Sequence, residues 1–177
     1  MNGTRFDRRP KRVLLVGMMG AGKTTVGHEL SGRLGWPYLD SDGEIIRITG
    51  MSVPEIFVRR GEPAFRWEET RVLAEATTTD FPVVVSVAGG AARDPDNRRR
   101  VRRAGYVVWL RANLSTLARR VGKGDGRPLL GNDPAAALEL LYLERMPLYR
   151  SLADHIVDVD QRTPGSVADE IQRALPR

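Results

Sequence analysis

Short apolar runs, rich in β-branched residues, alternate along the chain with longer stretches in which apolar residues recur at helical spacing. Strands separated by helices need crossover connections, which favour a parallel sheet with helices on both faces. The pattern therefore predicts an α/β fold, a three-layer α/β/α arrangement around a five-stranded parallel sheet. The predicted strands are residues 13–16, 38–39, 83–87, 106–110 and 156–159.

The longest helical stretches are residues 24–34, 64–76, 134–151 and 164–175. Two of them begin with an N-cap type residue followed by proline, Asp-Pro at 133–134 and Thr-Pro at 163–164, which is a typical helix start. The segment "VGKGDGRPLLGND", residues 121–133, is rich in glycine and charge, and we expect a mobile loop that serves as a lid. No linker or internal repeat interrupts the chain, which predicts a single domain over residues 1–177.

The amino-acid composition limits which side chains could bind a metal. The 177 residues include no cysteine and two histidines, so we expect any metal to be held by oxygen. The beginning of the chain shows no apolar core of a secretory signal, and no apolar run approaches the ~18 residues of a membrane span. We expect a cytoplasmic, monomeric protein without membrane partners.

The net charge of +6 is compatible with anionic small ligands and with nucleic acid. The densest basic run, "RRRVRRAG" at residues 98–105, has no interleaved aromatic residue on which bases could stack. We therefore interpret it as the solvated face of a helix and expect no nucleic acid partner, although salt-dependent nucleic acid binding stays open as an alternative.

The segment "GMMGAGKT", residues 17–24, matches the phosphate-loop pattern G-x-x-x-x-G-K-[ST] between a predicted strand and a predicted helix. Its backbone N–H groups and the start of the helix suit phosphate oxygens, Lys23 would reach the β- and γ-phosphates, and Thr24 would bind Mg²⁺. A glycine-rich turn without a ligand is the alternative. The predicted ATP contacts are Gly20, Ala21, Gly22, Lys23, Thr24 and Thr25.

Two carboxylates follow the second predicted strand, in "YLDSD". Ligands of an open α/β sheet bind at this carboxyl edge, so Asp40 and Asp42 are candidates for binding an acceptor and taking its proton. A strand would point both side chains to the same side. The alternative is that Asp42 only caps the following helix.

Further candidates are less specific by themselves. Arg66 and Glu69 are three residues apart on a predicted helix, and on spacing alone the pair is structural. Arg145 is one arginine among many, although guanidinium is the preferred partner of a ligand carboxylate. Gly89 and Gly90 indicate either a close backbone approach or a plain turn.

The order and spacing of "LDSD", "FRWEE", "AGGA", "RPLL" and "RMPLYR" after the phosphate loop resemble the shikimate kinases, from Arg12 to about Leu175. The resemblance implies a P-loop kinase fold with the lid at residues 121–133 and a shikimate-binding helical region at residues 42–78. It also implies that the chain transfers phosphate from ATP to the 3-hydroxyl of shikimate, with Mg²⁺ as cofactor, in aromatic amino acid biosynthesis.

The resemblance implies a role for each matching residue. Lys23, Asp42 and Arg127 would be catalytic, with Asp42 as the base and Arg127 closing over the phosphates. Thr24 would hold Mg²⁺, and Asp40 and Ser86 would do so through water. Arg120 and Pro164 would flank the adenine of ATP. The substrate would be bound by Asp42, Arg66, Gly89, Gly90 and Arg145, with Glu69 orienting Arg66.

The chain departs from the family at Ala88, where the family has a third consecutive glycine. A positive φ there would strain the alanine, and any other φ would make it tolerable. A kinase for another small hydroxy acid, such as gluconate or a modified shikimate, is the rival enzyme. A nucleotide-binding regulatory protein that has lost the transfer reaction is the rival of another class.

Overall fold

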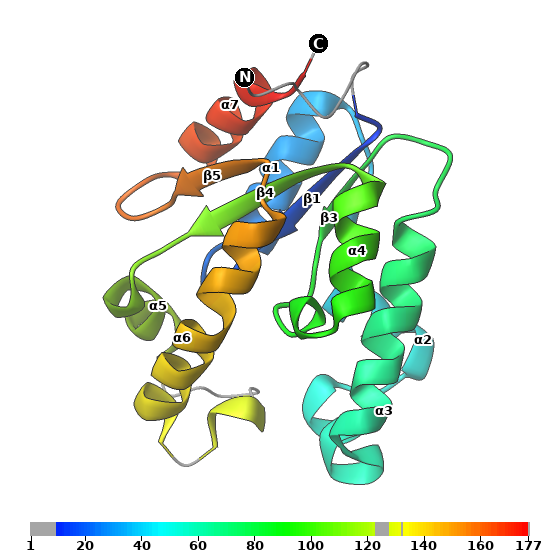
Figure 1. The fold of residues 1–177 in the computed structure, drawn as a ribbon, viewed down its shortest axis with the longest axis vertical. Helices are drawn as coiled ribbons and strands as arrows, with labels where there is room; N and C mark the ends of the chain where they lie inside the picture. Colours follow the sequence, from blue (N-terminus) through cyan, green and yellow to red (C-terminus); the bar gives the residue numbers. More distant parts are fainter. Residues whose placement is uncertain (1–9, 123–127, 132, 177) are drawn as a thin grey trace.

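A parallel β-sheet forms the centre of the molecule in this computed structural model (Figure 1). The structure describes residues 10–122, 128–131 and 133–176. Within them the sheet has five strands in the order β2-β3-β1-β4-β5, and every neighbouring pair is parallel. The strands are β1 (Arg12–Val16), β2 (Tyr38–Asp40), β3 (Val83–Ser86), β4 (Tyr106–Arg111) and β5 (His155–Asp158).

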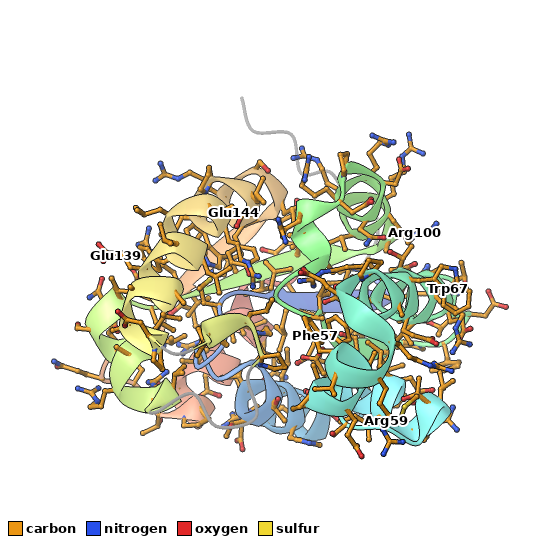
Figure 2. All side chains as sticks on the ribbon, turned by 90° about the horizontal axis from the view of Figure 1, so that it is seen from below. Phe57, Arg59, Trp67, Arg100, Glu139 and Glu144 are labelled. Carbon is orange, nitrogen blue, oxygen red and sulfur yellow. The ribbon has the colours of Figure 1, made fainter. Side chains whose placement is uncertain are left out.

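Helices cover both faces of the sheet, which confirms the three layers (Figures 1 and 2). Helices α1 (Lys23–Leu34) and α7 (Pro164–Ala174) pack against each other on one face. The other face carries α4 (Pro95–Ala104) and α6 (Pro134–Leu152) together with α3 (Val53–Ala76). Strands β1, β3 and β4 are almost wholly buried between the layers, as their continuous apolar sequence predicts.

The predicted strands and the four long helices are confirmed to within a residue or two, except that α3 begins well before residue 64. Its N-terminus is a capping box, in which Ser52 and Glu55 exchange hydrogen bonds. Gly61 (φ 80°, ψ 167°) interrupts the helix, and Pro63 follows, so the prediction caught only the second of two helical segments. The S-x-x-E pattern at residues 52–55 was the available signal.

Two shorter helices were not predicted as separate elements, α2 (Ser41–Thr49) and α5 (Leu114–Val121). The basic run does lie on a helix: in α4, Arg99, Arg100 and Arg103 are exposed while Val101 is buried (Figure 2 labels Arg100). Of the predicted lid, the described part contains a short 3₁₀ helix, η2 (Pro128–Leu130), and residues 123–127 and 132 lie outside the described residues.

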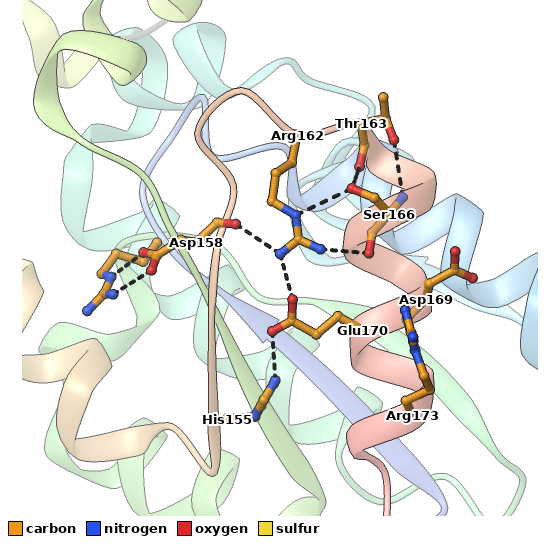
Figure 3. A network of polar contacts seen from close by, with 9 residues as sticks. His155, Asp158, Arg162, Thr163, Ser166, Asp169, Glu170 and Arg173 are labelled. Atoms are coloured by element: carbon orange, nitrogen blue, oxygen red, sulfur yellow. Dashed lines mark hydrogen bonds and ion pairs between the residues drawn. The ribbon is translucent and has the colours of Figure 1, made fainter.

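The connection between β5 and α7 is held by a network of charged groups (Figure 3). Arg162 donates to Glu170 at 2.6 Å and to the backbone oxygens of Asp158 and Ser166, and Glu170 also contacts His155. These contacts join both ends of β5 to α7. Among the helices of the described residues, none is long and apolar enough to cross a membrane.

Candidate active site

A cavity of about 800 Å³ lies at the carboxyl edge of the sheet, between the loop after β1, the start of α2, α3, the loop after β3, and α6. Because β2, β3 and β1 are neighbours, the residues that follow their carboxyl ends meet here. Much of the apolar wall comes from Val53, Phe57 and Phe65 on α3, of which only Phe65 belongs to a motif noted in the sequence. The predicted residues that line the cavity are Gly20, Gly22, Lys23, Thr24, Thr25, Asp40, Asp42, Arg66, Glu69, Ser86, Gly89, Gly90, Arg120 and Arg145.

The loop between β1 and α1 has the form that phosphate binding requires. Lys23 Nζ donates to the backbone oxygens of Gly17 and Met18, at 2.9 and 3.2 Å, so its ammonium group lies over the loop. Gly22 precedes α1, and no side chain of the described residues caps the helix. The first N–H groups of α1 therefore point toward the cavity with the positive end of the helix dipole.

Oxygen atoms gather on the side of the cavity next to this loop. Thr24 Oγ1 donates to Asp40 Oδ2 at 2.9 Å, and Tyr38 joins Asp40 to Ser86. Within the described residues there is no cluster of three or more histidine, aspartate or glutamate side chains that could hold a metal. Such a sparse oxygen set fits Mg²⁺, which keeps several waters and takes most other ligands from substrate phosphates.

Asp40 and Asp42 both line the cavity, but not for the reason that the sequence suggested. Asp40 ends β2 and caps α2, because its Oδ1 accepts the backbone N–H groups of Asp42 and Gly43. Asp42 lies in the first turn of α2 rather than two residues along a strand. The expectation that strand alternation points both the same way was wrong, and so was the alternative that Asp42 is the cap.

Arg66 lies between two carboxylates. Its Nη1 donates to Glu69, while its Nε and Nη2 donate to Glu62 Oε1 at 3.1 and 2.8 Å. Glu69 is only 2% exposed, so this is not the solvated pair that spacing alone suggested. Burial raises the pKa of Glu69, although Arg66 opposes that shift, whereas the hydrogen bonds from Arg66 lower the pKa of Glu62.

Arg145 lies within electrostatic reach of the same two glutamates but is less completely hydrogen-bonded than Arg66. Its side chain is 1% exposed, and its Nε and Nη2 have no hydrogen-bond partner among the described residues. One turn further along α6, the Tyr149 hydroxyl donates to the backbone oxygen of Gly89 at 2.8 Å. A buried guanidinium with unsatisfied donors is costly by itself, so this arrangement indicates an anionic ligand that completes it.

The two glycines after β3 are explained by these arginines. A Cβ atom at Gly90 would lie 2.0 Å from Arg66 Nη1, and one at Gly89 would lie 3.2 Å from Arg145 Nη1. The close backbone approach is therefore confirmed over the plain turn. Ala88 is tolerable, because the only non-glycine residue with positive φ in the described chain is Gln161.

Arg120 donates to the backbone oxygens of Gly20 and Val159, both at 3.2 Å, and so joins the phosphate loop to the segment after β5. Pro164 opens α7 and does not belong to the cavity wall. Arg127 lies outside the described residues.

A parallel sheet with a phosphate loop after its central strand, beside a cavity with basic and acidic groups, defines a P-loop kinase for a small anionic molecule. The family model "Shikimate kinase" matches residues 19–176. A shikimate kinase of Ruegeria pomeroyi is 48% identical over 93% of this chain and 83% of its own length. The chain belongs to the shikimate kinase family, whose members are ATP-dependent kinases that phosphorylate a hydroxyl group.

Solved structures agree with this assignment. Shikimate kinase from Acinetobacter baumannii in complex with shikimate superposes with a TM-score of 0.90 at 39% identity, covering 95% of this chain and 93% of that one. A gluconokinase from Sinorhizobium meliloti reaches a TM-score of 0.60 at 22% identity, over 92% of this chain and 90% of that one. The second likeness extends to the fold alone.

Proposed function

We propose that this member of the shikimate kinase family transfers the γ-phosphoryl group of ATP to the 3-hydroxyl of shikimate, and that the residues of the cavity carry out the transfer. The observation that carries the proposal is Arg145, which lines the same cavity as the phosphate loop and whose buried guanidinium has two nitrogens without a hydrogen-bond partner among the described residues. The related enzyme from Acinetobacter baumannii binds shikimate, a molecule with one carboxylate and several hydroxyl groups.

Arg145 and Arg66 would bind the substrate carboxylate. Arg145 has donors to offer, whereas Glu62 and Glu69 already occupy three nitrogens of Arg66 and hold its guanidinium in one orientation. Each nitrogen of the Arg66 terminal pair carries a second N–H for a ligand. Gly89 and Gly90, which both line the cavity, would offer backbone contacts to the ring hydroxyls.

Asp42 would accept the proton of the 3-hydroxyl of shikimate. The hydroxyl oxygen would form a bond to the γ-phosphorus while the bond between that phosphorus and the ADP oxygen breaks. Lys23 and the N–H groups at the start of α1 would hold the phosphates in line and stabilise the charge on them. Positioning and charge stabilisation would supply most of the rate, since phosphoryl transfer requires little covalent chemistry from the protein.

Thr24 would hold Mg²⁺ directly, and Asp40 and Ser86 would do so through water; the ion would neutralise charge on the β- and γ-phosphates. Arg120 would contact the nucleotide, supported by its hydrogen bond to the phosphate loop. Pro164 beside the adenine and Arg127 over the phosphates stay predictions. So do a cytoplasmic location, a monomeric state and the absence of nucleic acid and membrane partners.

The test is a coupled assay of ADP release with ATP and Mg²⁺, comparing shikimate, quinate, gluconate and no acceptor. Turnover on shikimate alone is expected. Asp42→Asn should lower kcat by ~10²-fold or more, because a general base contributes at least that much. Arg145→Gln should lower kcat/KM for shikimate at least ~30-fold, as loss of a buried charged contact does.

The control is Arg71→Gln, since Arg71 pairs with Glu68 and Glu75 on α3 outside the cavity and should leave shikimate turnover unchanged. Turnover on gluconate but not on shikimate would show that the acceptor is not shikimate. ADP release that never depends on an acceptor would contradict the kinase proposal.

A further inference from the structure

The hydroxyl group of Tyr38 lies among the oxygen atoms next to the phosphate loop, where Mg²⁺ is expected, and this side of the cavity is called the metal side below. No sequence pattern pointed to Tyr38. Tyr38 is the first residue of β2, two residues before Asp40. Its hydroxyl is 3.0 Å from Asp40 Oδ2 and 2.8 Å from Ser86 Oγ, which ends the neighbouring strand β3. It therefore joins two residues that are expected to reach Mg²⁺ only through water.

Hydrogen bonds within the protein use most of the accepting capacity of the Asp40 carboxylate. Oδ1 accepts the backbone N–H groups of Asp42 and Gly43, at 3.1 and 3.4 Å. Oδ2 accepts from the hydroxyls of Thr24 and Tyr38, at 2.9 and 3.0 Å. A carboxylate offers about four acceptor positions, so little remains for a direct bond to a cation. The geometry gives Asp40 the role of orienting the hydroxyls around it.

These contacts also set where the hydroxyl protons point. A carboxylate only accepts, so Thr24 and Tyr38 each direct their single proton at Asp40. The hydrogen bond between Tyr38 and Ser86 must then carry the Ser86 proton. As a result, the oxygen lone pairs of Thr24 and Ser86 are turned away from these protons and available to a cation or its waters.

Helix α1 is shaped to hold the Tyr38 ring. A Cβ atom at Gly27 would lie 2.3 Å from Tyr38 Cε2, so the ring packs directly on the backbone of the helix that begins at Lys23. The His28 ring also packs against it at a tilt, with ring centroids 4.2 Å apart. The hydroxyl is thereby held at a defined position relative to Thr24, one turn earlier in the same helix.

We propose that Tyr38 is a positioning residue for the metal side of this site: its hydroxyl holds Asp40 and Ser86 so that the lone pairs of Thr24 and Ser86 face Mg²⁺ and its waters. The inference rests on the proposed function for the identity of the cation and its nucleotide, and not on the identity of the acceptor. Tyr38 itself touches neither substrate nor cation.

The test is Tyr38→Phe, which keeps the ring and removes only the hydroxyl. Mn²⁺ serves as the probe, because its binding to the protein with ADP can be followed by electron paramagnetic resonance without turnover. The dissociation constant of Mn²⁺ should rise by about tenfold, as when an outer-shell partner of a metal ligand is lost. KM for shikimate should stay within about twofold, since the substrate arginines are not involved.

Tyr106→Phe is the matched control, because the Tyr106 hydroxyl donates to the backbone oxygen of Ala174, away from the cavity. It should leave Mn²⁺ binding at the wild-type value. A purely structural role would instead lower the melting temperature of Tyr38→Phe and leave its Mn²⁺ affinity equal to that of Tyr106→Phe, which overturns the proposal.

Should Tyr38→Phe not fold, Tyr38→Leu removes the same hydroxyl with a side chain that no longer needs to stack on His28, and it must show the same loss of Mn²⁺ affinity. Wild-type affinity in that variant also overturns the proposal. A wild-type protein that binds Mn²⁺ with ADP but does not phosphorylate shikimate would contradict the proposed function and leave the Tyr38 comparison fully decisive.

Discussion

Arg66 and Arg145 differ in how much of their hydrogen-bonding capacity the protein itself uses. Glu62 and Glu69 hold Arg66 from two sides, and Glu69 is buried enough that its own pKa is raised. Arg145 is buried, and its Nε and Nη2 have no hydrogen-bond partner in the part of the chain that the structure describes. In the proposed function a ligand carboxylate would therefore gain most from Arg145, while Arg66 would contribute through the orientation that its two glutamates impose. Glu62, which spacing alone did not single out, would be a positioning residue.

Gly90→Ala tests how closely Arg66 packs on the backbone. The new Cβ would fall 2.0 Å from Arg66 Nη1, so the guanidinium must move. Since the displaced atoms are at the end of a long side chain, the fold should survive. We expect KM for shikimate to rise about tenfold, corresponding to one lost charged hydrogen bond, with KM for ATP unchanged.

The matched control for that variant is Ala88→Gly, two positions earlier in the same loop. Ala88 has no positive φ, and its backbone N–H donates to Ser41 Oγ with either side chain. Shikimate KM should therefore stay at the wild-type value in steady-state kinetics. An unchanged KM in Gly90→Ala, or a changed one in Ala88→Gly, would contradict this account of the loop.

At the scale of elements, α3 brings two different walls of the cavity together because it is broken. Its first segment carries Phe57 and its second carries Phe65 and Arg66. Gly61 joins them at φ 80° and ψ 167°, a backbone region that is essentially restricted to glycine. A helix that continued straight through Gly61 would change the relative positions of Phe57 and Arg66, which now line the same cavity.

Gly61→Ala should lower the free energy of unfolding by about 1–3 kcal/mol, because the alanine must adopt the strained conformation or straighten the helix. A Cβ atom there would make only an ordinary 3.6 Å contact with Pro63, so the cost is conformational and not steric. Urea denaturation measures the change. Gly32→Ala, in the exposed interior of α1 with nothing nearby, should instead stabilise by about 0.5–1 kcal/mol.

At the scale of the whole molecule, carboxylates paired with arginines decide how stability depends on acid. Hydrogen bonds from arginine lower the pKa of Glu44, Glu62, Asp158 and Glu170. The unfolded chain then binds more protons than the folded one between these lowered values and the ordinary values near ~4. Their stabilisation is complete above that window and is lost as the pH falls through it, while the raised pKa of Glu69 opposes the trend.

We therefore expect the free energy of unfolding to fall as the pH drops below ~4.5, measured by urea denaturation across that range. Glu170→Gln should make the fall shallower, because one lowered carboxylate is removed from the network in Figure 3. Arg162→Gln, which removes the partner, should produce the same shallower slope. A slope in Glu170→Gln equal to that of the wild type would contradict the assignment.

The features that could be predicted from the sequence are those that depend on residues close together in the chain. The phosphate loop, the strands and the starts of α6 and α7 follow from local spacing and from proline and cap residues. Sequence reasoning failed at Asp42, where a strand period was applied across the point at which a helix begins. Helical spacing alone also missed the first segment of α3, because Gly61 and Pro63 break the helical pattern, and it did not single out α2, which spans only nine residues. Only the resemblance implied a helical region over residues 42–78.

The sequence by itself determined the class of fold, the phosphate loop and, through the order of its motifs, the family. These depend on periodicity and on short contiguous patterns. Only the tertiary structure decided which arginine is satisfied and which is not, why Gly90 must be glycine, and that Tyr38 joins Asp40 to Ser86. The physical reason is that burial and hydrogen-bond completion depend on which elements lie side by side. Tyr38 meets Ser86, and Arg145 lies next to Gly89, only because the parallel sheet and α6 bring distant segments to one edge.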